Sequence, residues 1–264
     1  MQSILFEIKE KVAVITLNRP DKLNSFNREM ALLLQHTLDA CEALQEVRCI
    51  YLTGAGKGFS AGQDLAEVAP SQPPPKGEEI TMKQILSEHY NPIITRIRKI
   101  NKPIVAAVNG VAAGAGANIA LACDVVVATT SASFIQAFSK IGLIPDSGGT
   151  FTLPKLIGFQ KASALMMLGD KISAADALQM GMLYKVFADD VFEEESKKIA
   201  ITLAQMPTKA LAYIKHVLNA SLTNNLEQQL LLEDEYQQKA AATKDFKEGV
   251  QAFLEKRQPN FIGE

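Results

Sequence analysis

Two short segments of this chain carry residues that could bind a polarised carbonyl group and move a proton beside it. Residues 112–118 have almost no side chains to cover their backbone N–H groups, and residues 138–149 set one carboxylate, that of Asp146, between an apolar run and a pair of glycines. Free N–H groups stabilise the negative charge that grows on a carbonyl oxygen, and a carboxylate beside it can act as a general base. The two segments together predict acid–base chemistry next to a carbonyl group.

Two roles are open for Asp146. Aspartate is among the residues favoured at a helix N-cap, and a helix could begin near Ser147. The apolar residues 141–145 favour catalysis instead, because apolar surroundings raise the pKa of a carboxyl group and make it a usable base near neutral pH. Asn118 is similarly either a site residue or a core amide whose hydrogen bonds are satisfied.

Strands and helices that alternate along the chain must position these segments. Apolar runs typical of buried strands cover residues 12–17, 49–53, 103–108 and 124–128, with a short strand at 186–187. Helices are predicted over 28–46, 82–100 and 114–123, from Ser173, and from residue 191 onward with a break at 221–225. The proline-rich residues 68–79 predict a mobile surface loop. This order indicates an α/β fold followed by a helical region for packing or assembly.

Composition excludes several classes of protein. The chain has 264 residues, 47% of them hydrophobic, which is enough for a large core and too much for a disordered chain. Its net charge is −2 and its pI is about 6.0, so nothing in the charge balance predicts a nucleic-acid or membrane partner. A small anionic ligand is compatible with this balance, because a few local Lys and Arg residues suffice to bind it.

Cysteine usage and the N-terminal sequence predict the compartment. Cys41, Cys49 and Cys123 are odd in number and have no motif spacing, which predicts free, buried thiols in a reducing compartment. The first residues lack the basic start and long apolar run of a signal peptide, and no apolar window is long enough to span a bilayer. We therefore expect a soluble cytoplasmic protein.

Two sequence motifs resemble sites of other kinds, but neither is complete. Residues 58–62 match the G-x-S-x-G turn of serine hydrolases, and the order Ser60, Asp146, His216 is permitted, but residues 54–57 separate Ser60 from its strand. Gly54 and Gly56 follow a strand as in dinucleotide-binding loops, but Phe59 stands where the third glycine is needed.

The histidines do not predict a metal site. His36, His89 and His216 lie far apart in the sequence, and none is paired with a carboxylate or thiol at ligand spacing. We therefore expect neither a metal nor a bound cofactor.

Six segments, in order along nearly the whole chain, resemble the crotonase (enoyl-CoA hydratase/isomerase) superfamily. They are residues 18–25, 58–65, 103–118, 144–149, 169–175 and 248–257. The resemblance implies an α/β fold, a crotonase-like spiral of β-β-α units. Residues 1–195 would form the core with an acyl-CoA site, and residues 196–264 a C-terminal helical oligomerisation region that builds a homotrimer or a dimer of trimers.

The resemblance also implies roles for individual residues. The backbone N–H groups of Gln63 and Ala115 would form an oxyanion hole that polarises the thioester carbonyl of acyl-CoA. Coenzyme A, present only as part of the substrate, would contact a set of residues at the start of the chain, in the middle and at the C-terminus: Lys22, Ala61, Gly62, Gln63, Asp64, Leu65, Lys256 and Arg257. Lys256 and Arg257 would come from a neighbouring subunit. The alternative is that Lys22, Lys256 and Arg257 are all solvated surface charges.

Departures from the family pattern narrow the activity. Hydratases of the family place water with two glutamates, and Asn118 and Phe138 stand at those positions, which argues against hydration. Asp146 falls where certain isomerases and the chlorobenzoyl-CoA dehalogenases carry their working aspartate. Residues 88–92, 112–122, 137–150 and 259–261 resemble the branch that converts ring-1,2-epoxyphenylacetyl-CoA to oxepin-CoA in phenylacetate degradation.

These implications predict an acyl-CoA isomerase in which Asp146 shuttles a proton along the acyl chain. Such an enzyme would also shift 3-enoyl-CoA to 2-enoyl-CoA. The acyl pocket would be formed by Tyr90, Asn118, Phe138 and Ile144, the last two keeping water out. Three alternatives stay open: an enoyl-CoA hydratase, an aryl-CoA dehalogenase, whose usual pocket tryptophan this chain lacks, and a non-catalytic crotonase-fold binding protein.

Overall fold

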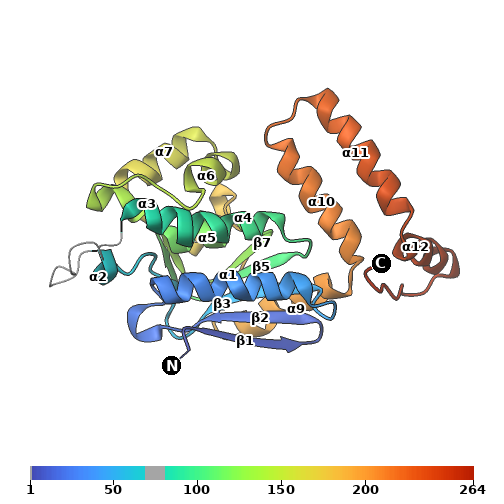
Figure 1. The fold of residues 1–264 in the computed structure, drawn as a ribbon, viewed down its shortest axis with the longest axis horizontal. Coiled ribbons are helices and arrows are strands. Elements are labelled where there is room, and N and C mark those ends of the chain that lie inside the picture. Colours follow the sequence, from blue (N-terminus) through green and yellow to red (C-terminus); the bar gives the residue numbers. More distant parts are fainter. Residues whose placement is uncertain (1, 69–80) are drawn as a thin grey trace.

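The computed structural model describes residues 2–68 and 81–264 and shows two β-sheets surrounded by helices (Figure 1). Of the surface loop predicted at 68–79, all but Val68 lies outside the described residues. Within the described ranges, no helix combines the length and apolarity needed to cross a membrane.

The larger sheet has six strands in the order β1-β2-β3-β5-β7-β10. β1 runs antiparallel to β2, and the remaining neighbours are parallel. The central strand β5 is buried along its whole length, which explains why the strand segments read as continuous apolar runs. The bounds are β1 (Ile4–Lys9), β2 (Val12–Leu17), β3 (Cys49–Gly54), β5 (Ile104–Val108), β7 (Val125–Thr129) and β10 (Lys185–Phe187).

The smaller sheet has four strands of three residues each, in the order β4-β6-β8-β9. They are β4 (Gly58–Ser60), β6 (Val111–Ala113), β8 (Ser133–Ile135) and β9 (Lys171–Ser173). β4, β6 and β8 each follow a strand of the larger sheet and lead into helices. This repetition is the spiral of β-β-α units that the resemblance to the family implied.

Helices cover both faces of the larger sheet. α1 (Arg28–Ala43) and α4 (Asn91–Lys99) belong to the main hydrophobic core, and α9 (Phe192–Gln205) packs Phe192, Ala200 and Ala204 on the opposite face. The other helical segments are η1 (Pro20–Lys22), α2 (Leu65–Val68), α3 (Met82–Gln84), η2 (Ile85–Tyr90), α5 (Ala115–Leu121), η3 (Ala137–Ile141), α6 (Gly149–Ile157), α7 (Phe159–Leu168) and α8 (Ala174–Met180). The helix predicted over 82–100 is therefore a continuous helical run with a π-helical segment, η2, in the middle.

The last three helices project away from the core (Figure 1). They are α10 (Thr208–Ser221), α11 (Leu226–Ala241) and α12 (Lys244–Glu255), and the break predicted at 221–225 is confirmed between the first two. The predicted boundary at 195/196 falls inside α9, whose apolar side chains pack on the sheet. The projecting part therefore begins after Gln205.

An ion-pair network attaches α10 to the core. The Lys215 ammonium group, nearly buried, lies 2.8 Å from the Asp124 carboxylate, which also accepts a hydrogen bond from the Ile104 N–H. Asn219, one turn further along α10, exchanges hydrogen bonds with Arg98 at the end of α4. These contacts fix the direction in which the helical region leaves the sheet.

Candidate active site

A pocket of about 220 Å³ lies where the two predicted segments meet. Its lining is mostly apolar, with one carboxylate and one amine among the described residues. The lining residues are Ala61, Gly62, Gln63, Leu65, Val68, Met82, Ile85, Tyr90, Gly114, Ala115, Ala137, Phe138, Lys140, Ile141, Leu143 and Asp146. The structure thus brings together both backbone segments and the carboxylate that the sequence singled out.

The backbone N–H of Gln63 is free to face this pocket. The residues on either side of Gln63 both bond to Phe26: the Gly62 carbonyl accepts from the Phe26 N–H at 2.7 Å, and the Asp64 N–H donates to the Phe26 carbonyl at 2.8 Å. Because successive peptide groups of an extended segment point in opposite directions, the Gln63 N–H points away from Phe26. No described residue accepts a hydrogen bond from it.

The second free N–H belongs to Ala115, the first residue of α5. The first N–H groups of a helix have no acceptor within the helix, and no side chain caps this one. Its neighbour Gly114 has φ +52°, which turns the chain sharply from β6 into the helix. A Cβ added to Gly62 would lie 3.4 Å from the Ala115 nitrogen, so the backbones that carry the two N–H groups are in close contact.

The carboxylate of Asp146 is half-buried in the pocket wall. Burial raises its pKa above the ordinary value, although the hydrogen bond from Ser147 Oγ to Asp146 Oδ1, 2.8 Å long, opposes that shift. The helix that follows begins at Gly149 with Gly148 as N-cap and has no side-chain cap. Asp146 is therefore not a helix cap, and its side chain is available for proton transfer.

Two aromatic rings line the pocket. Tyr90 is almost completely buried, and burial raises its pKa well above the ordinary value, as do the nearby carboxylates of Asp146, Glu67 and Asp64. Phe138 lies over Gly114, because a Cβ added there would approach the end of the ring to 3.7 Å. The rings give the pocket flat apolar walls beside the carboxylate.

Two residues predicted to line the acyl pocket do not do so. Asn118 is buried behind Asp146, with its side chain bonded to the Asp146 carbonyl and to Gln136. Ile144 is 80% exposed on the outer surface, while Ile141 and Leu143 of the same apolar run face the pocket. The chain turns at Gly142, which follows η3 and has φ +73°, so one apolar run supplies both pocket-lining and exposed side chains.

The residues predicted to contact coenzyme A fall into two groups. Ala61, Gly62, Gln63 and Leu65 line the pocket, and Lys22 lies on η1, which is tied to this segment by the hydrogen bond from Ala61 N–H to the Leu23 carbonyl (2.9 Å). Asp64 instead pairs with Arg19, Oδ2 to Nη2 at 2.8 Å.

Lys256 and Arg257 lie at the end of α12, across the molecule from α2 and α3 (Figure 1). The structure does not bring them to the pocket of their own chain. Arg257 is also paired with the carboxylates of Glu248 and Glu255, each at 2.6 Å.

The structure excludes the serine-hydrolase alternative. Ser60 is fully buried, and its hydroxyl donates to the Asn24 carbonyl at 2.8 Å. His216 lies on α10, where its ring bonds to Asn101. No hydrogen bond links these two residues to each other or to Asp146 among the described residues.

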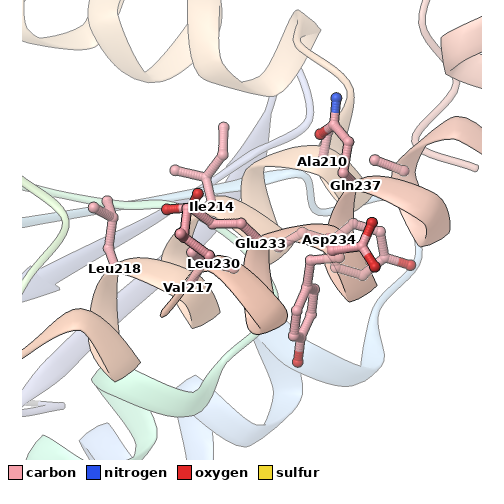
Figure 2. Close-up of a pocket in the computed structure, with 11 residues that line it drawn as sticks. Ala210, Ile214, Val217, Leu218, Leu230, Glu233, Asp234 and Gln237 are labelled. Atoms are coloured by element: carbon pink, nitrogen blue, oxygen red, sulfur yellow. The ribbon is translucent and has the colours of Figure 1, made fainter. Parts of the chain in front are cut away.

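A larger groove, of about 650 Å³, runs between α10 and α11 and is shown in Figure 2. Ile214, Val217, Leu218 and Leu230 point into it, and Glu233 and Asp234 lie along it. The first N–H groups of α11 are capped by the Asn225 side chain rather than directed into this groove. The smaller pocket, which combines free N–H groups with a carboxylate, is therefore the candidate active site.

The fold and the pocket together define a class of protein: a β-β-α spiral in which two free backbone N–H groups face an apolar pocket with one carboxylate. Residues 7–264 match the enoyl-CoA hydratase/isomerase family. The chain belongs to this family.

Named relatives and solved structures are similar to this chain over nearly its whole length. It is 45% identical, over 100% of its length and 99% of the relative's, to the 1,2-epoxyphenylacetyl-CoA isomerase of Escherichia coli. It is 44% identical, over 99% of its length and 98% of the relative's, to a "probable enoyl-CoA hydratase" of Rhodobacter capsulatus. The solved enoyl-CoA hydratase of Bacillus anthracis is 33% identical, with a TM-score of 0.91 and 100% of both chains covered. The fold prediction is confirmed.

Several site residues were not found from the sequence. Met82 and Ile85 line the pocket, and only their place in a helical apolar pattern could have indicated them. Ser147 and Gln136 do not line the pocket, but their side chains bond to those of Asp146 and Asn118, respectively. Ser147 could have been predicted, because it is next to the candidate base Asp146 in the sequence. Nothing in the sequence indicates a role for Gln136.

Proposed function

We propose that this protein is an acyl-CoA isomerase in which Asp146 is the acid–base group and the N–H groups of Gln63 and Ala115 form the oxyanion hole. One observation carries the proposal: among the described lining residues of the pocket, Asp146 supplies the only carboxylate, and it shares that pocket with both residues that present a free N–H. Isomerisation needs one group that removes a proton and returns it.

The geometry supports the following sequence of steps. The thioester carbonyl accepts hydrogen bonds from Gln63 and Ala115, each contributing roughly 3–4 kcal/mol as charge develops on the oxygen. Asp146 removes a proton from the carbon between the thioester and the double bond of a 3-enoyl-CoA, giving an enolate. The protonated Asp146 then returns the proton to the far carbon, and the double bond becomes conjugated with the thioester.

The pocket also suits an aromatic acyl group. A cavity of about 150 Å³ is enough to hold benzene in a protein core, and this pocket measures about 220 Å³. Tyr90 and Phe138 provide flat walls, and Ile85 and Leu143 add apolar surface. We therefore propose ring-1,2-epoxyphenylacetyl-CoA, converted to oxepin-CoA, as a substrate, consistent with what the Escherichia coli relative is named for.

Hydration is the second candidate, favoured by the name of the Rhodobacter capsulatus relative. A hydratase needs groups that bind and activate water. Phe138 offers none, and the Asn118 amide is buried and already bonded at both its nitrogen and its oxygen. The dehalogenase and non-catalytic alternatives have no specific observation in their favour.

We further propose that the chain assembles as a homotrimer or a dimer of trimers through its C-terminal helices. Large apolar side chains are exposed along α10–α12, including Leu218, Leu231 and Phe253, the last 83% exposed. Exposed apolar surface of this kind marks an interface. Sedimentation would show a multiple of the 28.7 kDa chain for the wild type and a shift to monomer for Phe253→Asp. A monomeric wild type would contradict the proposal.

Assembly also affects which cations can bind coenzyme A. Lys22 can bind the phosphates within one chain, whereas Lys256 and Arg257 can do so only across a subunit contact.

We also propose a reducing, cytoplasmic location. The three cysteines are free and buried, which supports it.

The test of function is product identification. The purified protein is incubated separately with a 3-enoyl-CoA, a 2-enoyl-CoA and ring-1,2-epoxyphenylacetyl-CoA, and products are resolved by chromatography and mass spectrometry. We expect products of unchanged mass from the first and third substrates and no gain of water by the second. Water addition to the 2-enoyl-CoA without isomerisation of either other substrate would establish a hydratase and overturn the proposal.

A further inference from the structure

The side chain of Asn118 contacts the backbone of Asp146 directly. Its Nδ2 donates a 2.8 Å hydrogen bond to the Asp146 carbonyl oxygen, and the Gly149 N–H donates to the same oxygen at 2.8 Å. Two donors on one carbonyl fix the orientation of the peptide group that follows Asp146. This peptide group sets the direction in which the Asp146 side chain leaves the backbone.

A third residue holds the other end of the Asn118 amide. The Asp146 carbonyl can only accept a hydrogen bond, so the nitrogen of Asn118 must face it, and the oxygen Oδ1 is left to accept a 2.8 Å hydrogen bond from Gln136 Nε2. Both side chains are buried. The Gln136 Oε1 atom has no hydrogen-bond partner among the described residues. An unpaired buried oxygen is unfavourable, and the bond to Asn118 is the side-chain hydrogen bond that Gln136 makes among the described residues.

Gly149 provides the space for this arrangement. A Cβ added at Gly149 would lie 2.3 Å from Asn118 Nδ2, too close for both to remain in place. Any larger residue at 149 would push the amide away from the Asp146 carbonyl.

Ser147 completes the constraint from the other side. It is buried with φ +51°, a left-handed conformation that is unfavourable for a residue other than glycine. In this conformation its hydroxyl reaches back to Asp146 Oδ1. The backbone around Asp146 is thus held on both sides by buried groups that do not face the pocket.

We propose that Asn118, held by Gln136, is a positioning residue that aims the carboxylate of Asp146 at the substrate. The inference rests on the proposed function, in which Asp146 is the base. Asn118 does not touch the substrate; it acts through the peptide group of Asp146.

The kinetic test compares Asn118→Leu in two backgrounds. Leucine has nearly the same size and no charge, and it cannot donate to the Asp146 carbonyl. In the wild-type background we expect kcat for 3-enoyl-CoA isomerisation to fall by about 10- to 100-fold with little change in KM, because a small misplacement of a reacting group is costly. In the Asp146→Asn background we expect no further fall, since the group being positioned is gone. An equal loss in both backgrounds, or an unchanged kcat, would overturn the inference.

A second variant guards against a folding defect. Gly149→Ala keeps Asn118 in the chain but displaces its amide, and we expect it to reproduce the loss of kcat. Ser196→Ala, which removes a buried hydrogen bond to Tyr51 on the opposite face of the sheet, is the matched control and should leave kcat unchanged.

A measurement that does not need the reaction separates this inference from the proposed function. The pKa of the Asp146 carboxyl group is followed by carbon NMR in the wild type, in Asn118→Leu and in Ser196→Ala. We expect Asn118→Leu to move it towards the ordinary value, as the carboxyl group leaves its buried position, and Ser196→Ala to leave it unchanged. An unshifted value in Asn118→Leu would overturn the positioning role even if the protein proved to have another activity. A wild type that fails to isomerise but shows the shift would overturn only the proposed function.

Discussion

The hydroxyl of Tyr90 donates a 2.7 Å hydrogen bond to the side-chain oxygen Oε1 of Gln63. The same glutamine presents its backbone N–H to the pocket, and its Nε2 donates to Glu67 Oε2 at 3.0 Å. The other Glu67 oxygen accepts from the Arg28 N–H at 2.8 Å. This chain of bonds links the aromatic wall of the pocket to the loop that carries the proposed oxyanion donor, so the two are not independent parts of the site.

Replacing Tyr90 with phenylalanine tests that link. The change leaves Gln63 Oε1 without its donor while preserving the ring, and a lost hydrogen bond of this kind is worth about 1 kcal/mol. We therefore expect kcat/KM to fall by roughly fivefold, measured with a 3-enoyl-CoA. Tyr184→Phe, at an exposed tyrosine outside the pocket, is the control and should leave kcat/KM unchanged. Equal activity of wild type and Tyr90→Phe would show that the bond does not support the oxyanion hole.

Gly62→Ala tests the close approach of the two backbone segments. A Cβ at Gly62 would lie 2.8 Å from the Ala113 carbonyl oxygen, and its φ of +88° is unfavourable for alanine. The substitution must separate Gln63 from Ala115, and loss of one oxyanion donor lowers kcat by about 100-fold or more.

Gly158→Ala is the matched control for this variant. Gly158 also has a positive φ, +79°, but a Cβ there meets nothing within 4 Å. It should therefore lose stability without the same loss of kcat. Comparable kcat losses in the two variants would mean that backbone strain, not the oxyanion hole, explains the effect.

The pH dependence of the rate follows from the raised pKa of Asp146. The base must be ionised to accept a proton, so activity falls as pH drops through this pKa. Because burial raises the pKa above the ordinary value of 3.8, we expect the acidic limb of kcat/KM above that of an ordinary carboxyl group. Ser147→Ala removes the hydrogen bond that opposes the shift and should move the limb to still higher pH. A limb that stays in place in Ser147→Ala would contradict this assignment.

The same shift predicts the sign of a stability effect. A group whose pKa is higher in the folded state favours folding most when protonated, and this contribution is lost as pH rises through the folded pKa. Ionised Asp146 should therefore destabilise the wild type near pH 7. We expect Asp146→Asn to have the higher Tm at about pH 7, and the difference to shrink as pH falls through the folded pKa and to level off below about 4, where the carboxyl group is protonated in the unfolded state as well. A constant difference across this range would contradict the account.

Asp124→Asn tests the attachment of α10 to the core. Burial lowers the pKa of Lys215, and the Asp124 carboxylate opposes that shift. Removing this charge leaves a buried ammonium group without compensation, which costs about 3 kcal/mol or more. Urea unfolding should show this loss, whereas Glu193→Gln, at an exposed pair with Lys197, should change stability by less than about 1 kcal/mol. Similar effects from the two variants would contradict the buried role of the pair.

The fold could be predicted from the sequence where elements are long and apolar. The strand at 12–17 was located to the residue, and the strands around 104–108 and 125–129 to within one residue. The strands β4, β6, β8 and β9 were not predicted, because three residues are too few to establish a periodicity. β1 was missed because most of its side chains are exposed, so it lacks the burial pattern of an inner strand.

The site was only partly predictable for geometric reasons. Exposed N–H groups around Ala115 could be predicted from the small residues 112–118, whereas Gln63 was indicated only by the resemblance to the family. The direction of a side chain was harder to infer: Ile144 points outward although Ile141 and Leu143 line the pocket, and Asn118 turns behind Asp146. The place of Lys256 and Arg257 depends on how α12 leaves the core, which no local pattern determines.

The central claim is that Asp146 transfers the proton. The most direct measurement follows the appearance of conjugated 2-enoyl-CoA from 3-enoyl-CoA by ultraviolet absorbance, for wild type and Asp146→Asn, with binding of the product measured in parallel. We predict conversion by the wild type and a loss of at least about 100-fold in the variant, with binding retained. An Asp146→Asn protein that isomerises at the wild-type rate would contradict the account.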